Sequence, residues 1–391
     1  MDFSEIISEK AGRIKPSGIR RFFDMAEKMP DCIALGVGEP DFKTPWHIRQ
    51  AAITSLQKGD TRYSSNAGLM SLRKEVSRYF SRRFDLEYNP ENQIIITVGG
   101  SEAIDDIIRS VVSHGDEVLI PQPSFVCYAP LTELAGGVPV MLPTYEKDSF
   151  KLMPEVLKNA ITPRSKLLIM PYPNNPTGAL MEKEDYEKIA AVLEGTNIVV
   201  LSDEIYIELN YSQSKPFSFA NTKGMYERTI VVNGFSKTYA MTGWRIGFAC
   251  GPKEIMKTAL KIHQYGIMCA PTTSQYAAIE ALKNGDDDIE YMRENYNMRR
   301  RFLLDSFSSM SVPCFEPKGA FYVFPNISKY AENSESFCTD FLEKAHVAVV
   351  PGSAFGSNGE GFVRISYAYS LEHLKKAMDR LDKYINTKVD L

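Results

Sequence analysis

The chain lacks the features that define several classes of protein. None of its apolar runs approaches the roughly 18 residues that a membrane span needs, and residues 1–5 lack the basic stretch and apolar stretch of a secretory signal. Its six cysteines form no C-x-x-C pair, which argues against a zinc site or a disulfide framework. We therefore expect a cytoplasmic protein without a metal or a membrane partner.

Strong charge of either sign is also missing. The 45 Lys and Arg residues stand against 49 Asp and Glu residues, a formal net charge of −4. Such a balance does not predict nucleic acid as a partner. Apolar residues make up 44% of the 391 residues and charged residues 24%, an ordinary globular composition that excludes wholesale disorder. The length predicts roughly two to three domain-sized units.

The middle of the chain predicts an α/β fold. Short apolar runs, many of them separated by helical patterns such as 102–112 and 183–193, recur at 94–98, 118–120, 138–142, 167–170, 198–201, 230–232 and 246–250. Several runs are continuous rather than alternating, which is typical of strands covered on both faces. We expect a mostly parallel sheet of about seven strands, flanked by helices.

The two ends of the chain differ from this middle. From about residue 286, charged helical stretches (289–307 and 371–385) alternate with short strands (321–324, 347–350 and 361–366), which predicts a smaller α+β unit. Residues 1–40 have no core of their own, so we expect them to pack on that unit or to serve as a lid. The three acids 286–288 are expected to form a solvated turn.

The strongest chemical signal is the segment 233–247, NGFSKTYAMTGWRIG, which directly follows an apolar strand. It places Lys237 at a strand end among small and aromatic residues, with Arg245 eight positions later. Desolvation lowers the pKa of a lysine, and the neutral amine can then attack a carbonyl to form a Schiff base. Taken alone, the segment is also compatible with a lysine and an arginine on an ordinary loop.

Several blocks together resemble the class I/II aminotransferases, enzymes of fold type I that depend on pyridoxal 5'-phosphate. Ser236-Lys237 with TGWRIG (242–247) is similar to the lysine signature of that family. The other blocks follow in the family's order: LGVGEPDF (35–42), Tyr63 with NAG (66–68), GGSEA (99–103), NNPTG (174–178), SDEIY (202–206) and VRISYA (363–368). The resemblance therefore spans residues 35–368, and it implies the same fold and cofactor.

The resemblance assigns a group of residues to the cofactor phosphate. Gly100, Ser101 and Glu102 follow a predicted strand and open a helix, where free backbone N–H groups and the helix dipole can hold a dianion. Arg245 resembles the family arginine that contacts the same phosphate in a bidentate way. Many relatives have a serine three positions before the lysine. Gly234 stands there in this chain, so Ser236 or a water is expected to supply that contact.

Other residues match the family positions around the cofactor ring. Asp203 would keep the pyridine nitrogen protonated, and Tyr206 and Asn175 would donate hydrogen bonds to the phenolic oxygen. Phe125 occupies the aromatic position that stacks on the ring and contacts the substrate. Lys237 would hold the cofactor as a Schiff base.

A further set matches positions that bind the substrate or a neighbouring subunit. Arg364 resembles the arginine that grips the α-carboxylate, and Gly38 and Asn175 would add contacts to it. Tyr63 resembles a residue that reaches the phosphate of a neighbouring subunit. The resemblance therefore implies a homodimer with composite active sites.

These roles predict an aminotransferase that moves an amino group between an L-amino acid and a 2-oxo acid in a ping-pong cycle. Lys237 would carry the proton between the substrate Cα and the cofactor. Glutamate and 2-oxoglutarate are expected as one substrate pair, and the donor stays open among aspartate, alanine, aromatic amino acids and acylated diaminopimelate. Arg20 is compatible both with contact to a distal carboxylate and with a solvated position on a helix.

Two other functions remain open at this point. A carbon-sulfur β-lyase on the same fold would use the same Lys237, Asp203 and Arg364. A non-enzymatic ligand sensor of this fold would need a DNA-binding module, and the roughly 35 residues before Gly36 are few for one. The motifs divide the chain into a cofactor domain, residues 41–285, and a smaller domain made of residues 1–40 and 286–391.

Overall fold

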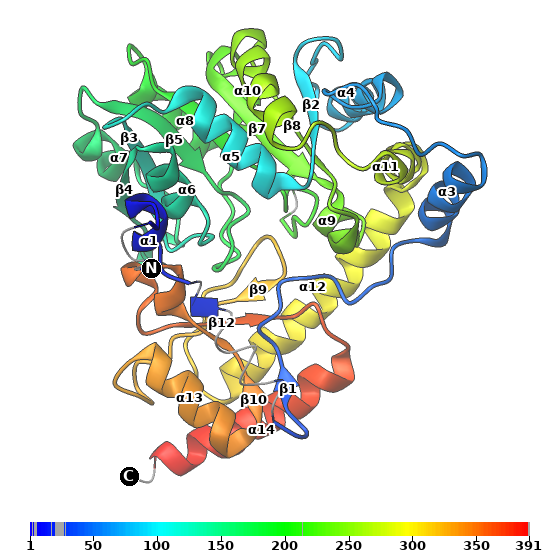
Figure 1. The fold of residues 1–391 in the computed structure, drawn as a ribbon. Coiled ribbons are helices and arrows are strands. Elements are labelled where there is room, and N and C mark those ends of the chain that lie inside the picture. Colours follow the sequence, from blue (N-terminus) through cyan, green and yellow to red (C-terminus); the bar gives the residue numbers. More distant parts are fainter. Residues whose placement is uncertain are drawn as a thin grey trace.

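The computed structural model describes residues 1, 3, 6–16, 18–19, 27, 29–212 and 214–389. Its centre is a seven-stranded sheet in the order β2-β8-β7-β6-β5-β3-β4 (Figure 1). The strands are β2 Ile94–Thr97, β3 Glu117–Gln122, β4 Val138–Pro143, β5 Ser165–Met170, β6 Val199–Asp203, β7 Thr229–Gly234 and β8 Gly247–Cys250. β8 pairs antiparallel with both neighbours, and every other pairing is parallel. The predicted α/β fold with a mostly parallel seven-stranded sheet is confirmed.

Helices cover both faces of this sheet, as its continuous apolar strands require. Leu167 and Ile169 of β5 pack on the face covered by α5 Gly100–Val111, α6 Tyr128–Ala135 and α10 Lys253–Gly266. Leu168 and Met170 point to the opposite face, where α7 Pro154–Ala160 and α8 Lys183–Leu193 pack. The remainder of that face, over β2 and β8, is covered by α3 Trp46–Gln57, α4 Met70–Phe84 and α11 Thr272–Asn284.

A second, smaller layer lies beside the carboxyl ends of the parallel strands (Figure 1). Its three-stranded antiparallel sheet has the order β11-β12-β9, with β9 Tyr322–Val323, β11 Val350–Pro351 and β12 Val363–Ser366. The helices α12 Asp286–Ser309, α13 Ser334–Ala345 and α14 Leu371–Val389 pack around it. The short helices are α1 Glu9–Arg13, α9 Phe235–Thr238, η2 Glu146–Asp148, η3 Phe219–Asn221, η4 Tyr226–Arg228, η5 Thr242–Trp244, η6 Gly352–Phe355 and η7 Ser357–Gly359.

The strand predicted over 347–350 is in fact two strands. β10 Val347–Ala348 pairs in parallel with β1 Ile33–Ala34, and β11 begins at Val350 and pairs with β12. The chain changes partners at Val349, which is itself buried in the core of the smaller layer. One apolar run therefore serves two sheets, and hydrophobicity alone does not mark such a change.

The solvated turn predicted at 286–288 is wrong, because these three acids form the first turn of α12. Carboxylates are favourable at a helix N-terminus, and two of them also form ion pairs. Arg82 Nη2 lies 3.0 Å from Asp286 Oδ1, and His47 Nε2 lies 2.9 Å from Asp288 Oδ2. The helix then runs from the core beneath α3 and α4, where Ile289 is buried, into the core of the smaller layer.

The N-terminal residues lie against both layers. α1 packs against α6 of the large sheet, and β1 pairs with β10 in the smaller layer (Figure 1). Arg20 lies outside the described residues, so the structure adds nothing on its role. The division into residues 41–285 and residues 1–40 with 286–391 stays a prediction. Among the helices of the described ranges, none has the length and apolar character to cross a bilayer.

Candidate active site

A cavity of about 280 Å³ lies between the large sheet and the smaller layer. It sits beyond the carboxyl ends of β2, β3, β5, β6 and β7, the usual ligand position in an open α/β sheet. Eleven of the predicted site residues line it: Gly38, Gly100, Ser101, Phe125, Asn175, Asp203, Tyr206, Ser236, Lys237, Arg245 and Arg364. Its volume is close to the lower end of the roughly 300–1,000 Å³ of small-molecule sites.

Lys237 lies in the short helix α9, directly after β7. Its Nζ donates a hydrogen bond to the carbonyl oxygen of Gly38 at 2.6 Å. Burial, helped by the charges of Arg364 and Arg245, lowers the pKa of the Lys237 amine to about 8, although the charges of Glu39 and Asp203 act in the opposite direction. An amine with this pKa is partly neutral near physiological pH and is therefore available as a nucleophile and a base.

Asp203, the last residue of β6, presents a buried carboxylate to the cavity. Burial raises its pKa above the ordinary value, although hydrogen bonds from Tyr128 and the Ile205 N–H, and the charge of Lys237, act in the opposite direction. Tyr128 donates to Asp203 Oδ2 at 2.6 Å. Tyr128 was not predicted from the sequence, although its position three residues after Phe125 was an available signal. This carboxylate has the chemistry to pair with a protonated ring nitrogen.

The start of α5 and Arg245 form an anion cradle at one end of the cavity. Gly99, at the N-cap of α5, has a φ of +81°, and a Cβ there would lie 2.8 Å from Arg245 Nη2. Only glycine permits both this backbone conformation and this close approach. Arg245 Nη1 donates to the carbonyl oxygen of Thr242 at 3.0 Å. The exposed N–H groups of the helix and the guanidinium fit a phosphate group.

Gly234, which replaces the serine of many relatives, lies where β7 and β8 approach closely. A Cβ there would lie 3.0 Å from Gly247 Cα and 3.2 Å from the carbonyl oxygen of Ile246. A side chain at this position would therefore require the neighbouring backbone to shift by a few tenths of an ångström. Ser236, two residues later, lines the cavity and places a hydroxyl there.

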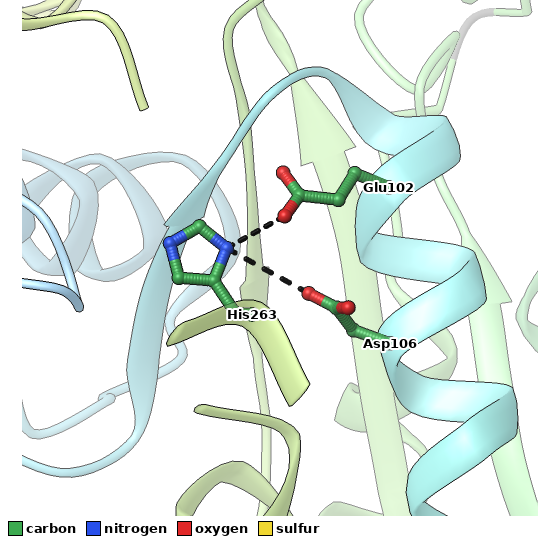
Figure 2. Close-up of side chains that lie close together, drawn as sticks. All are labelled: Glu102, Asp106 and His263. Atoms are coloured by element: carbon green, nitrogen blue, oxygen red, sulfur yellow. Dashed lines mark hydrogen bonds and ion pairs between the residues drawn. The ribbon is translucent and has the colours of Figure 1, made fainter. Parts of the chain in front are cut away.

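Glu102 does not line the cavity, and its side chain points toward Asp106 and His263 (Figure 2). Its carboxylate accepts from the Val98 N–H and lies 2.7 Å from His263 Nδ1, which is 3.8 Å from Asp106 Oδ2. Burial, reinforced by the charge of Glu102, raises the pKa of Asp106 to about 7. Burial lowers the pKa of His263, but the two acids outweigh it and the net shift is upward. Glu102 therefore holds the turn from β2 to α5.

Arg364 of β12 is 3% exposed and lies between two aromatic rings. Its guanidinium carbon is 4.6 Å from the ring centroid of Tyr322 and 4.8 Å from that of Phe355. Nη1 donates to Asn175 Oδ1 at 2.8 Å and Nη2 to the carbonyl oxygen of Gly36 at 2.5 Å. Nε has no partner among the described residues. A buried cation with a free donor fits a carboxylate ligand.

Two further tyrosines differ in their surroundings. Tyr322 lines the cavity, and its hydroxyl lies 2.8 Å from that of Tyr206. From the sequence, Tyr322 is predicted only as part of a short strand, because nothing in that pattern marks a polar contact. Tyr63 lies outside the cavity of its own chain, and 82% of it is exposed.

The comparisons with known proteins agree over nearly the whole chain. The family described as aminotransferase class I and II matches residues 30–381. YugH of Bacillus subtilis is 48% identical over 97% of this chain and 98% of its own length. Aspartate aminotransferase of Pyrococcus abyssi is 44% identical over 98% of this chain and 99% of its own length. The crystal structure of the aromatic aminotransferase of Pyrococcus horikoshii has a TM-score of 0.90 at 43% identity, covering 95% of this chain and all of that one.

Proposed function

The chain belongs to the class I and II aminotransferases, and from this premise we propose that its cavity binds pyridoxal 5'-phosphate and exchanges amino groups between an L-amino acid and a 2-oxo acid. The observation that carries this proposal is the Lys237 amine. Its pKa is lowered to about 8, and it lines one cavity together with a buried carboxylate, Asp203, and a buried guanidinium, Arg364. These three groups supply a base, an anchor for a ring nitrogen and an anchor for a carboxylate.

The lining residues support a consistent placement of the cofactor. Gly100, Ser101, Ser236 and Arg245 would hold the phosphate, and Asp203 would hold the ring nitrogen. Tyr206 and Asn175 would donate to the phenolic oxygen, and Phe125 would pack on the ring. When bound, pyridoxal 5'-phosphate supplies an aldehyde that combines with amines and a ring that accepts electrons from the substrate Cα.

Lys237 moves the proton in this proposal. In its neutral form Nζ takes the proton from the substrate Cα, and the carbonyl oxygen of Gly38 keeps Nζ within the cavity. Because its pKa is about 8, roughly one-tenth of the amine is neutral at pH 7, against well under one-thousandth for an ordinary lysine. Burial therefore increases the fraction of the Lys237 amine that is neutral, and so able to accept a proton, near neutral pH.

Arg364 orients the substrate. Nη1 and Nη2 of its guanidinium donate hydrogen bonds to Asn175 and Gly36, which fixes the orientation of the guanidinium and of its remaining N–H groups. A carboxylate bound there is fixed in position and in rotation, which aligns the Cα–H bond with Lys237. Gly38 and Asn175 would add contacts to this carboxylate.

We propose a homodimer in which Tyr63 reaches the phosphate of the partner subunit. Support comes from the exposure of Tyr63 and from its apolar surroundings. Asn66 Nδ2 donates to the carbonyl oxygen of Met268 at 2.8 Å, which joins the Tyr63 loop to the segment that carries Tyr265 and Met268. These two side chains are 88% and 47% exposed. The cytoplasmic location stays a prediction.

The candidate amino donors are aspartate, alanine, aromatic amino acids and acylated diaminopimelate. Relatives of this chain include an aspartate aminotransferase and an aromatic one. Among the described residues the cavity holds no cation besides Lys237, Arg245 and Arg364, and Ile19, Phe125 and Tyr322 give it apolar walls. Glutamate with 2-oxoglutarate is proposed for one half-reaction, and single-turnover reactions with each candidate donor would identify the other.

The test uses purified protein loaded with pyridoxal 5'-phosphate. We expect a visible absorption band, a borohydride-stable label on Lys237, and loss of transamination in Lys237→Ala. Lys253→Ala, which removes an exposed lysine at the start of α10, is the matched control and keeps full activity. Full activity of Lys237→Ala would refute the proposal. Release of pyruvate and ammonia from cystathionine without 2-oxo acid exchange would instead indicate a β-lyase.

A further inference from the structure

Tyr322 connects the two layers at the cavity. It belongs to β9 of the three-stranded sheet, whereas Tyr206 follows β6 of the seven-stranded sheet. Their hydroxyls lie 2.8 Å apart, and the two rings meet edge to face with centroids 5.8 Å apart. Tyr322 is fully buried and Tyr206 is 5% exposed. The pair is therefore a buried hydrogen bond between the layers, in a setting where water competes little.

The same tyrosine also contacts the carboxylate-binding side of the cavity. The guanidinium of Arg364 lies over its ring, 4.6 Å from the centroid. β9 and β12 pair antiparallel, with Tyr322 opposite Ser366, so the position of the ring follows that of the strand that carries Arg364. A Cβ on Gly38 would lie 2.4 Å from the Tyr322 hydroxyl, so this hydroxyl packs closely against Gly38. The carbonyl oxygen of the same glycine accepts the hydrogen bond from Lys237 Nζ.

We propose that Tyr322 is a positioning residue with two parts: its hydroxyl orients the phenol of Tyr206, and its ring face holds the guanidinium of Arg364. The proposal rests on the proposed function, in which Tyr206 donates to the phenolic oxygen of the cofactor and Arg364 binds the substrate carboxylate. A phenol has a single proton. Tyr206 can give that proton to the cofactor only if Tyr322 is the donor within the pair.

The surroundings favour Tyr322 as that donor. Burial raises the pKa of both phenols, and the charge of Arg364 opposes this effect on both. The guanidinium lies directly over the Tyr322 ring, which makes the Tyr322 O–H the more acidic and the better donor. A hydrogen bond from Tyr322 polarises the Tyr206 O–H and strengthens its own donation into the cavity.

The decisive experiment is a pH titration of the visible absorption band of the bound cofactor. Tyr322→Phe keeps the ring and removes the hydroxyl. Because donation from Tyr206 weakens, we expect the midpoint of the titration to rise by about 0.4 to 1 pH unit. The KM for the 2-oxo acid should change less than about twofold, since the ring face beneath Arg364 remains.

Three further variants separate the two parts. Tyr322→Leu should show the same shift and in addition raise the KM for the 2-oxo acid roughly 2- to 30-fold, because the ring is lost. In a Tyr206→Phe background, adding Tyr322→Phe should leave the midpoint unchanged, because the hydroxyl acts only through Tyr206. Tyr296→Phe is the matched control. Its hydroxyl is buried in the same core cluster, has no partner among the described residues, and should cause no shift.

An unshifted midpoint in Tyr322→Phe, an equal shift in Tyr296→Phe, or a further shift in the double variant would each overturn the proposed role of Tyr322. An unchanged KM in Tyr322→Leu would overturn the part that concerns Arg364. Failure of the proposed function is distinguishable from these outcomes, because the unsubstituted protein would then bind no pyridoxal 5'-phosphate and show no visible band.

Discussion

Replacement of Arg364 by lysine would test how the cavity recognises a carboxylate. Lysine keeps the positive charge but is a point charge on a flexible stem, whereas the guanidinium is a planar fork. In the structure this fork is held on two sides, by hydrogen bonds to Asn175 and Gly36 and by the rings of Tyr322 and Phe355. Arg364→Lys therefore changes the geometry of the anchor without removing its charge.

The expected loss follows from the contacts. One charge-assisted hydrogen bond to a carboxylate is worth about 1.5 to 3 kcal/mol. Loss of one such bond lowers kcat/KM for an amino acid by about 10-fold to about 150-fold. Cofactor binding should be unaffected, because Arg364 lies on the three-stranded sheet, whereas Ser101, Asp203 and Lys237 all follow or end strands of the large sheet.

The assay compares two substrates in single-turnover half-reactions followed by the visible band. One is L-phenylalanine, and the other is 2-phenylethylamine, which lacks only the α-carboxylate. We expect Arg364→Lys to slow the first and leave the second unchanged. Arg300→Lys is the matched control, because Arg300 is also buried, with its guanidinium 5.4 Å from the Tyr211 ring, yet lies outside this cavity. Equal losses for both substrates, or a change below about threefold for phenylalanine, would refute the reasoning.

Two other substitutions probe the cradle and the buried cluster. Gly99→Ala should cost about 1 to 2 kcal/mol of stability through its positive φ and weaken binding of pyridoxal 5'-phosphate by about tenfold or more, measured by fluorescence titration. Asp106→Asn should stabilise the protein at pH 8. The pKa of Asp106 is raised to about 7, so the folded state binds a proton between pH 4 and 7 that the unfolded state does not. The stability of the unsubstituted protein therefore falls across that window, and the variant should gain about 1 to 3 kcal/mol relative to it, measured by urea unfolding.

Each of these substitutions has a control at a comparable position. Gly115 has a φ of +84° and nothing within 4 Å of its Cβ position, so Gly115→Ala should lose similar stability and keep its cofactor affinity. Loss of affinity in both glycine variants would contradict a specific clash at residue 99. Asp105→Asn removes a carboxylate of the same helix that is paired with Arg109, so it should not stabilise the protein at pH 8. If Asp106→Asn and the unsubstituted protein differ in free energy of unfolding by the same amount at pH 4 and pH 8, the result would be inconsistent with titration of Asp106.

The central sheet could be predicted from the sequence because its strands contain short apolar runs, several of them continuous, between polar segments. The boundaries that failed lie where tertiary contacts decide. Val347–Ala348 and Val350–Pro351 form one apolar run but pair with different strands. The acids of 286–288 are typical of a solvated turn when the sequence is considered alone. In the folded chain Arg82 of α4 and His47 of α3 form ion pairs with them. Both errors concern partners that are far away in the sequence.

The candidate site could be predicted where a motif carries the chemistry and not where packing supplies it. Motifs gave Lys237, Asp203 and Arg364, which the fold brings to one cavity. The positioning groups were missed because a buried tyrosine has the same sequence pattern whether or not its hydroxyl is engaged. Tyr128 and Tyr322 are of this kind. For Glu102 the motif concerns the backbone N–H at the start of α5, and it did not reveal the contact of the carboxylate with His263.

The helix α12 connects the two layers, because its residues are buried in the cores of both. Its 24 residues make a rod about 36 Å long. The first turn is tied to α3 and α4 by ion pairs, and its later turns are embedded in the core around β9 and β12. A tilt of about 5° at the tied end would sweep the far end through about 3 Å, a distance comparable to a hydrogen bond. His47, although remote from the cavity, therefore contributes to holding the smaller layer against the large sheet, through its ion pair with the first turn of this helix.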